Sequence, residues 1–319
     1  MATISEGTFE HGGASFYSKT WTPQGPVRAK IVFVHGFSEH ITRYDEFFST
    51  LAAQGIQVFS WDQRGWGRSV KKPSERGLTG PTSQVVDDVA AFLRDKLPGV
   101  AGKDKTSNGQ DATARAPVFV MGHSMGGGEI MVLAGDAKYA GLVGRVRGWI
   151  LDSPFIGFAA GEEPNAIKVL AGRLVGRLLP KQQVTHVVPP ESLSRDPAIV
   201  ESVRNDPLCH NTGTLEGLAS LLGRTAMLSS GQVRLGKQVR SLLLAHGLED
   251  RVCSCDAAVK FLERQHAVED KTCKTYAGGY HQIHADLCKD EFTKDLVAWV
   301  LERSSDDLPP SSQHPESKL

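Results

Sequence analysis

Short runs of apolar residues alternate with longer amphipathic segments along most of the chain. The apolar runs have the length of strands and predict a β-sheet. They cover Ile31–His35, Val58–Trp61, Pro117–Gly122, Gly148–Asp152, Ser241–His246 and a last segment near Thr272–Ala277. The amphipathic segments predict helices over Arg43–Gln54, Ser83–Lys96, Met125–Lys138, Asp256–His266 and His284–Arg303. Strands that alternate with helices imply βαβ crossovers, and therefore an α/β fold with a mostly parallel central sheet and helices on both faces.

Two segments outside this alternation have their own patterns. Gly7–Glu10 and Ala14–Trp21 flank a Gly12-Gly13 pair, which predicts an antiparallel hairpin at one edge of the sheet. The segment Gly99–Ala116 is polar and rich in Gly, Lys and Asp, which predicts a surface loop.

The longest interruption begins after the sixth predicted strand. Over residues 155–237, helical segments, prolines and short apolar clusters replace the regular alternation. An insertion at this place is expected to form a helical cap over the carboxyl edge of the sheet, where open α/β sheets bind ligands. We therefore predict a core made of 1–154 and 238–303, a cap at 155–237 and a disordered tail at 304–319.

Composition and charge exclude several classes of protein. The chain has 319 residues, of which 40% are hydrophobic and 23% are charged, and its 36 Lys and Arg balance its 36 Asp and Glu. These values are typical of a globular protein and argue against disorder, collagen and coiled coils. A neutral chain without a dense basic run gives no indication of nucleic-acid binding. No membrane-spanning apolar run and no signal-peptide layout is present, so we expect a soluble protein outside the usual secretory route.

The five cysteines predict neither a disulfide framework nor a zinc site. They are odd in number and scattered, and Cys253-Ser-Cys255 lacks the spacing of a redox or zinc motif. We expect free thiols in a reducing compartment.

A serine motif lies at the junction of a predicted strand and a predicted helix. Gly122-His-Ser124-Met-Gly126 follows an apolar run and opens an amphipathic segment. A nucleophilic serine on a tight strand-to-helix turn needs glycine on both sides, because the turn is strained and packs closely on neighbouring backbone. A glycine-rich linker with a passive serine is the alternative, but the position of the motif favours the nucleophile.

A serine nucleophile needs a base, and the base needs a carboxylate to hold it. In sheets of this type the chain order is serine, acid, histidine. Asp250 and His281 follow the last two predicted strands, at the same sheet edge as Ser124. Glu249 is a competing acid, whereas Asp256 has the position of a helix cap.

The oxyanion of an acyl-transfer reaction needs two N–H donors aimed at one point. Met125 supplies one of them, and the loop His35-Gly-Phe37 supplies the other through Phe37. His35 and His40 suggest metal ligation, but no carboxylate or cysteine completes a set in the sequence. We therefore predict neither a metal nor a cofactor.

Six short motifs occur in a fixed order along residues 5–303. They are His35–His40 with Arg43-Tyr44, Asp62–Ser69, Gly122–Gly126, Asp206–Cys209, His246–Asp250 and Gly279–His284. Together they resemble the monoacylglycerol lipase family of the α/β-hydrolase superfamily, in its fungal type.

The resemblance implies specific roles for residues of this chain. By it, Ser124, Asp250 and His281 form a catalytic triad, and Phe37 and Met125 give the oxyanion N–H groups. It also implies that Glu39, Arg43 and His284 lie at the polar end of the pocket, near the glycerol moiety. His284 competes with His281 as the base, and its place in the first turn of the last predicted helix favours a pocket-lining role.

The predicted function is hydrolysis of monoacylglycerols to fatty acid and glycerol. The alternatives are a broader carboxylesterase or a lysophospholipase on the same scaffold and, more remotely, a cofactor-free haloperoxidase or a non-catalytic binding protein of the same fold. Binding proteins of this fold generally lose a triad member, and all three are present here.

The cap segment Ile167–Lys181 has the pattern of a cationic amphipathic helix. Arg173, Arg177 and Lys181 gather on one helical face and apolar residues on the other. Such a helix either contacts a lipid surface or packs its apolar face on the core.

The last three residues of the sequence predict a location. Ser317-Lys318-Leu319 is the tripeptide that a peroxisomal import receptor reads, and a polar, proline-containing stretch precedes it. We expect a peroxisomal protein, with cytoplasm or lipid droplets as the second choice.

Overall fold

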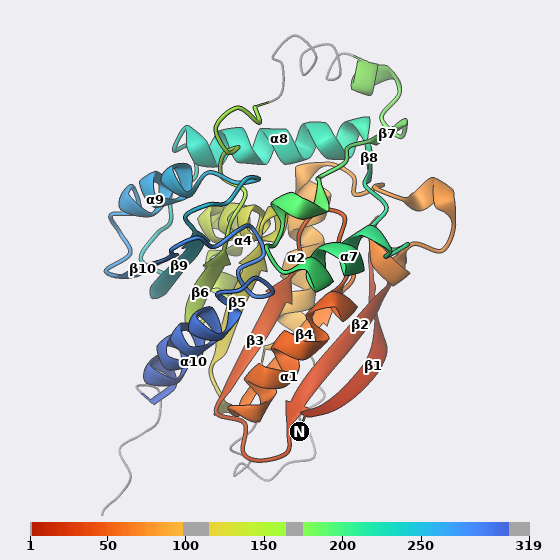
Figure 1. Ribbon diagram of the computed structural model, residues 1–319. Helices are drawn as coiled ribbons and strands as arrows, with labels where there is room; N and C mark the ends of the chain where they lie inside the picture. The colour runs from red at the N-terminus through yellow and green to blue at the C-terminus, as the bar shows by residue number, and fades with distance from the viewer. Residues whose placement is uncertain (1, 98–114, 164–174, 306–319) are drawn as a thin grey trace, which may run out of the picture.

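A central eight-stranded sheet organises the molecule, whose computed structural model describes residues 2–97, 115–163 and 175–305 (Figure 1). The strand order is β1-β2-β4-β3-β5-β6-β9-β10. The six strands from β4 to β10 run parallel, and the β1–β2 hairpin joins antiparallel at one edge. The strands are β1 (Ala2–His11), β2 (Ala14–Pro23), β3 (Ala29–Val34), β4 (Ile56–Trp61), β5 (Val118–His123), β6 (Gly148–Asp152), β9 (Ser241–Gly247) and β10 (Asp270–Tyr276). The prediction of a mostly parallel sheet is confirmed.

Helices cover both faces of this sheet. The helices of the core are α1 (Asp45–Ala53), α2 (Thr82–Lys96), α4 (Met125–Gly135), α5 (Ala140–Val143), α9 (Cys255–Glu263) and α10 (Lys289–Ser305). Short 3₁₀ turns are η1 (Ile41–Tyr44), η2 (Gly67–Ser69), η3 (Pro73–Glu75) and η4 (Ala137–Tyr139). Arg43 therefore lies in a 3₁₀ turn before α1, and α10 begins five residues after His284. The prediction that His284 starts the last helix is wrong, because residues 284–288 form turns instead.

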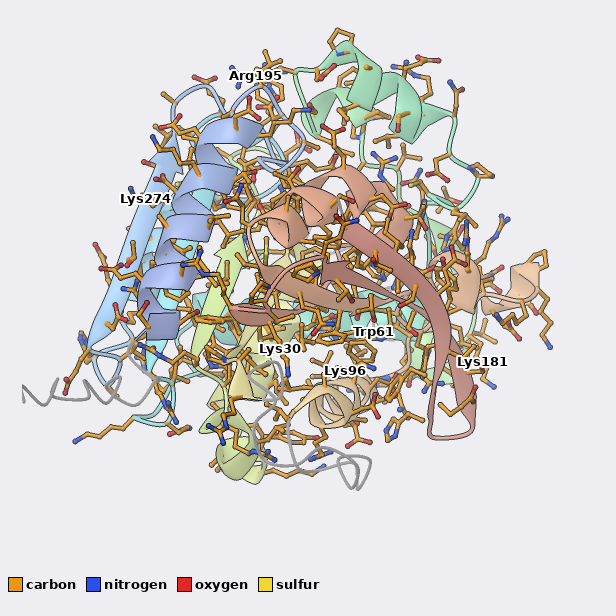
Figure 2. All side chains as sticks on the ribbon, turned by 90° about the horizontal axis from the view of Figure 1, so that it is seen from below. Lys30, Trp61, Lys96, Lys181, Arg195 and Lys274 are labelled. Carbon is orange, nitrogen blue, oxygen red and sulfur yellow. The ribbon has the colours of Figure 1, made fainter. Side chains whose placement is uncertain are left out.

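The central strands are buried on both faces, which explains their continuous apolar sequences. Every residue of β3 and of β5 is buried. Side chains alternate between two core clusters, since Ile31 and Phe33 face α1 and α10 whereas Val32 and Val34 face α2, α4 and α9. Figure 2 shows Trp61 well inside the molecule and Lys274, on β10, at the outer edge.

The described residues between β6 and β9, called the cap below, lie at the carboxyl edge of the sheet (Figure 1). Figure 1 shows α8 lying across α4 at the top of the molecule. The elements of this segment are β7 (Gln183–Thr185), η5 (Pro190–Ser192), α7 (Pro197–Arg204), β8 (Thr212–Thr214) and α8 (Leu215–Ser229). Strands β7 and β8 pair as a small antiparallel sheet, so the segment contains strands as well as the expected helices.

Three sequence predictions fall wholly or largely on residues that the structure does not describe. The Gly99–Ala116 loop and the first half of the Ile167–Lys181 helix lie outside the described residues, except at their ends. Ser317–Leu319 also lie outside them, so the peroxisomal signal stays a prediction from the sequence. Among the helices that the structure describes, none has the length and apolarity of a membrane span. The five cysteines are free.

A buried ion pair joins the cap to the core beneath it. Arg224 on α8 donates to Glu129 on α4 with an N–O distance of 3.1 Å, and both side chains are almost fully buried. Burial raises the pKa of Glu129 to about 7, although the Arg224 guanidinium acts in the opposite direction. The ionised carboxylate is therefore less stable here than in the unfolded chain.

The linkage between this carboxyl group and folding gives a pH-dependent prediction. Because the pKa of Glu129 is raised above its ordinary value of 4.5, the folded state binds more protons and loses stability as pH rises from about 4.5 to 7. Glu129→Gln removes this titration, so the free energy of unfolding of the variant relative to the unsubstituted protein should rise by about 3 kcal/mol between pH 4.5 and pH 8. Urea unfolding of both proteins across this range measures the difference, and a difference that does not change with pH would contradict the prediction.

Candidate active site

Ser124 lies in a tight turn between β5 and α4. Its backbone has φ 51° and ψ −116°, which is unfavourable for a residue with a side chain. The turn needs its glycines, because a Cβ at Gly122 would lie 2.6 Å from the Gly126 carbonyl carbon and one at Gly126 would collide with the Val34 carbonyl oxygen. Ser124 therefore lies at the carboxyl edge of the sheet, directly before the N-terminus of α4.

Asp250 and His281 lie together at the same edge. His281 Nδ1 is 2.8 Å from Asp250 Oδ2, and both side chains are nearly inaccessible. Asp250 follows β9 and also accepts the backbone N–H groups of Val252 and Cys253. Burial would raise the pKa of Asp250, but His281 and these hydrogen bonds lower it. The carboxylate is therefore an anion that can hold the imidazole of His281.

The two competing acids lie elsewhere. Glu249, directly before Asp250, is exposed to solvent. Asp256 pairs with Lys260 on the exposed side of α9 at 2.6 Å, and Ser254, not Asp256, caps that helix. The geometry thus favours Asp250 as the partner of His281.

The loop after β3 packs directly on the serine turn. A Cβ at Gly36 would lie 2.6 Å from Glu39 Oε2 and 3.2 Å from Ser124 Cβ, so only glycine fits. Phe37 follows, with its ring 4.8 Å from that of Trp66. Phe37 and Met125 both line the cavity that contains Ser124. The two predicted oxyanion donors therefore lie beside the same cavity as Ser124.

Glu39 connects the loop after β3 to the loop that carries His281. Its carboxylate accepts the Gly36 N–H at 2.9 Å, the Tyr44 hydroxyl at 2.6 Å and the Gln282 side-chain amide at 2.5 Å. Burial would raise the pKa of Glu39, but His123 and the Tyr44 hydroxyl lower it to about 2. Glu39 lines the cavity as expected, yet its oxygens are already engaged by these protein donors.

His284 lies behind the cavity wall and not in it. Its Nδ1 is 2.7 Å from Asp152 Oδ2, its ring stacks on Tyr44, and it is absent from the residues lining the cavity. Burial would lower the pKa of His123, but Asp152 and Glu39 raise it to about 9. The interpretation of His284 as a glycerol-binding residue does not fit this placement, because the other side chains of the cluster surround its ring.

His123 and Asp152, for which the sequence patterns predicted no role in the site, contribute to this buried network. Asp152 Oδ2 lies 3.2 Å from His123 Nδ1. Asp152 ends β6, and an acid at the carboxyl end of a buried parallel strand is the signal that could have identified it. His123 stands directly before Ser124, where its role was hidden within the serine motif.

Arg43 lines the cavity and contacts the cap. Its guanidinium donates to Ser202 Oγ at 3.2 Å and lies 3.6 Å from Asp206 Oδ2. His40 Nε2 is 2.7 Å from the same Asp206 oxygen. These contacts hold the end of α7 to the turn before α1.

The cavity at Ser124 has a volume of about 540 Å³. Apolar side chains from the cap form most of its wall, and charged or polar groups gather near Ser124 and α7. The apolar wall consists of Phe155, Phe158, Val187, Val188, Leu193, Val203, Leu218, Leu221, Leu222 and Val252. Such a cavity suits a ligand with one long apolar part and a small polar head.

Within the described part of the chain, three groups of side chains have the spacing of metal ligands. One joins His40, Asp206 and Cys209, so the expectation that no acid or cysteine approaches His40 is wrong. Burial raises the pKa of the Cys209 thiol to about 12, and the Arg43 guanidinium beside Asp206 disfavours a cation there. The other two groups are the paired His123–Asp152–His284 cluster and Asp250 and His281 with Cys253. Their donor atoms are already engaged with one another, which favours hydrogen-bonded networks over metal sites.

Comparisons with known proteins agree with this geometry. The family described as "Serine aminopeptidase, S33" matches residues 25–287. The monoglyceride lipase of Rattus norvegicus is 32% identical over 91% of this chain and 88% of its own length. The monoacylglycerol lipase of Mycolicibacterium smegmatis is 29% identical over 94% of this chain and 98% of its own. A soluble variant of Saccharomyces cerevisiae monoglyceride lipase superposes with a TM-score of 0.79 at 20% identity, over 95% of this chain and 97% of that one.

The family match covers most of the chain, and the similarity to the rat lipase covers nearly all of both chains. The parallel sheet, the strained serine turn and the Asp250–His281 pair are the structural counterparts of that similarity. The chain therefore belongs to the serine aminopeptidase S33 family of α/β-hydrolases and, within it, to the monoacylglycerol lipases.

Proposed function

We propose that this protein is a serine hydrolase that cleaves the ester bond of monoacylglycerols, releasing a fatty acid and glycerol. One observation carries the proposal. Ser124 and His281 line the same cavity as Phe37, in the loop after β3, and Met125, at the start of α4, and much of the wall of this cavity is apolar. The substrate class is supported by the names of the similar lipases from rat and Mycolicibacterium.

In the proposed mechanism, Ser124 is the nucleophile. Its hydroxyl attacks the ester carbonyl while His281 accepts the proton, and Asp250 holds the imidazole in the required orientation. The N–H groups of Phe37 and Met125 bind the tetrahedral oxyanion. His281 then gives the proton to the leaving glycerol oxygen. Water, activated by the same imidazole, attacks the acyl-enzyme and releases the fatty acid.

The cavity has separate places for the two ends of the substrate. The apolar wall contributed by the cap accepts one acyl chain. The glycerol moiety then lies toward Glu39 and Arg43, where charged groups line the cavity. In this proposal residues 155–237 form the cap, and the acyl chain is buried between the cap and the core.

The proposed triad gives the first prediction on activity. Ser124→Ala and His281→Ala should each lower the turnover of a monoacylglycerol by about 10⁴-fold or more, because the nucleophile or its base is lost. Ser229→Ala and His266→Ala, both at exposed positions, serve as matched controls and should retain activity. Fatty-acid release and labelling by a fluorophosphonate measure the effect. Labelling that persists in Ser124→Ala would refute the assignment of the nucleophile.

The size of the cavity gives a prediction on substrate class. A cavity of about 540 Å³ holds one acyl chain and a small head but not three chains, so a monoacylglycerol should be cleaved much faster than a triacylglycerol. Fatty-acid release is measured on mono-, di- and triacylglycerol, a lysophospholipid and a short activated ester. Equal rates on emulsified triacylglycerol would contradict the proposal, and preference for the lysophospholipid or the short ester would favour the two alternative activities.

We further propose that the cap contacts lipid surfaces. Residues 175–178 are helical, and Val175, Leu178 and Leu179 expose 46%, 83% and 54% of their surface. These apolar side chains are directed to solvent and not to the core, which favours the lipid-contact interpretation of this segment. Arg177 and Lys181 lie among them and supply positive charge for anionic headgroups.

This proposal gives a prediction on membrane binding. Replacing Leu178 and Leu179 with serine should weaken binding to phosphatidylcholine vesicles by about tenfold per leucine. Neither leucine lines the cavity, so hydrolysis of a soluble ester should be unchanged. Ile4→Ser, an exposed apolar position on β1, is the control. Binding of Arg177→Glu and Lys181→Glu is measured on vesicles with added phosphatidylserine, at low and high salt. Unchanged vesicle binding in all variants would refute the lipid contact.

A further inference from the structure

Asp286 is a buried carboxylate in the loop between β10 and α10, and it binds donors from two directions. Its Oδ1 accepts the backbone N–H of Arg195 at 2.7 Å, and its Oδ2 lies 2.9 Å from Arg195 Nη2 and 3.0 Å from Nε. The same Oδ2 accepts the backbone N–H of Tyr280 at 2.9 Å. Arg195 belongs to the cap, whereas Tyr280 directly precedes His281.

Further hydrogen bonds connect the same two segments. The N–H of Gln282 donates to the Leu193 carbonyl at 2.8 Å, and Ser194 Oγ donates to the Ala285 carbonyl at 3.2 Å. The residues on both sides of His281 are therefore tied to a three-residue stretch of the cap. Figure 2 shows Arg195 where the cap segment meets the C-terminal part of the chain.

The approach between Arg195 and the histidine loop is close. A Cβ at Gly278 would lie 2.7 Å from Arg195 Nη1, and Gly278 has a φ of +68°. The guanidinium of Arg195 also lies 5.8 Å from the ring centroid of Tyr280. Burial would raise the pKa of Asp286, but the hydrogen bonds from Arg195 and Tyr280 lower it, so the carboxylate remains charged and its bonds are strong ones.

The cap stretch at Arg195 continues directly into the wall of the cavity. Asp196 caps α7 by accepting the Ala198 N–H, and Val203 and Arg204 at the end of α7 line the cavity. Leu193, just before Arg195, lines it as well. The hydrogen bonds of Asp286 therefore connect this part of the cavity wall to the loop that carries His281.

We propose that Arg195 and Asp286 are positioning residues. They hold the catalytic His281 in a fixed position relative to the cap, so that kcat depends on the position of the cap. The inference rests on the proposed function, in which His281 is the base. A base must lie within hydrogen-bond reach of the proton it accepts, and a displacement of about 1 Å can cost about 100-fold in rate.

The test compares two ion pairs of the same chemistry. Arg195→Met and Asp286→Asn remove the connection to the cap, and Arg195→Lys keeps the charge but loses the two-point contact. Arg303→Met is the matched control, because Arg303 binds Asp270 through two nitrogens at 2.7 Å each and joins α10 to β10 away from the cap. The kcat and KM are measured on a water-soluble short ester, together with the melting temperature and the low-field proton resonance of the His281 N–H bonded to Asp250.

We expect Arg195→Met and Asp286→Asn to lower kcat by about 10- to 100-fold with little change in KM, and to broaden or shift the His281 resonance. The kcat of Arg195→Lys should lie between those of these two variants and that of the unsubstituted protein. The double variant Arg195→Met/Asp286→Asn should have a kcat no lower than that of the more impaired single variant, because both substitutions act through one contact. Arg303→Met should lower the melting temperature and leave kcat and the resonance unchanged.

Other outcomes would overturn the inference. If Arg195→Met and Asp286→Asn behave like Arg303→Met, the pair is structural only. If the effect appears in KM alone, the pair shapes the cavity and does not position the base. Failure of the proposed function is a separate result, since it would appear as absent hydrolysis and absent fluorophosphonate labelling in the unsubstituted protein.

Discussion

At Ser124 the backbone adopts φ 51°, and the surrounding residues must balance the strain of about 1–3 kcal/mol that such a conformation costs. Close packing offsets this strain. Strand β5 leads into the turn and α4 follows it. Gly36, Gly122 and Gly126 leave room for neighbouring atoms with which a side chain at these positions would collide. Two further backbone hydrogen bonds fix the turn, from the Ser124 N–H to the Asp152 carbonyl and from the Phe155 N–H to the Ser124 carbonyl. The first reaches β6 and the second reaches the start of the cap, so the turn, the sheet and the cap constrain one another.

A buried network of charges lies behind this turn and sets the electrostatics of the site. Asp152 and Glu39 are anionic, and His123 between them has a raised pKa, so the cluster compensates much of its own charge. Such groups cost several kcal/mol to bury unless they are paired, and accordingly Glu39 accepts three hydrogen bonds and Asp152 pairs with two histidines. Glu39 holds the loop that carries Phe37 and also binds Gln282 beside His281. The network therefore fixes the loop that carries Phe37 relative to the loop that carries His281.

The parts of this arrangement that depend on local sequence could be predicted, and those that depend on tertiary contacts could not. Ser124, Asp250 and His281 follow apolar runs, and strands of a parallel sheet bring their carboxyl ends to one edge. His284 was misplaced because residues 284–288 read as the start of an amphipathic helix. The helix begins at Lys289 instead. The turns before it place Asp286 against Tyr280 and Arg195. No pattern in the local sequence indicates that Asp286 has a partner in the cap.

Among the described residues, charged and polar side chains attach the cap to the core at three separate points. Arg224 contacts Glu129 above α4, Asp206 contacts Arg43 and His40 before α1, and Arg195 contacts Asp286 beside the loop that carries His281. Rigid displacement of the whole cap would separate all three, and each separation leaves a largely buried charge without its partner, which is costly. These attachment points therefore hold the wall of the cavity that the cap contributes in a fixed position relative to the loop that carries His281.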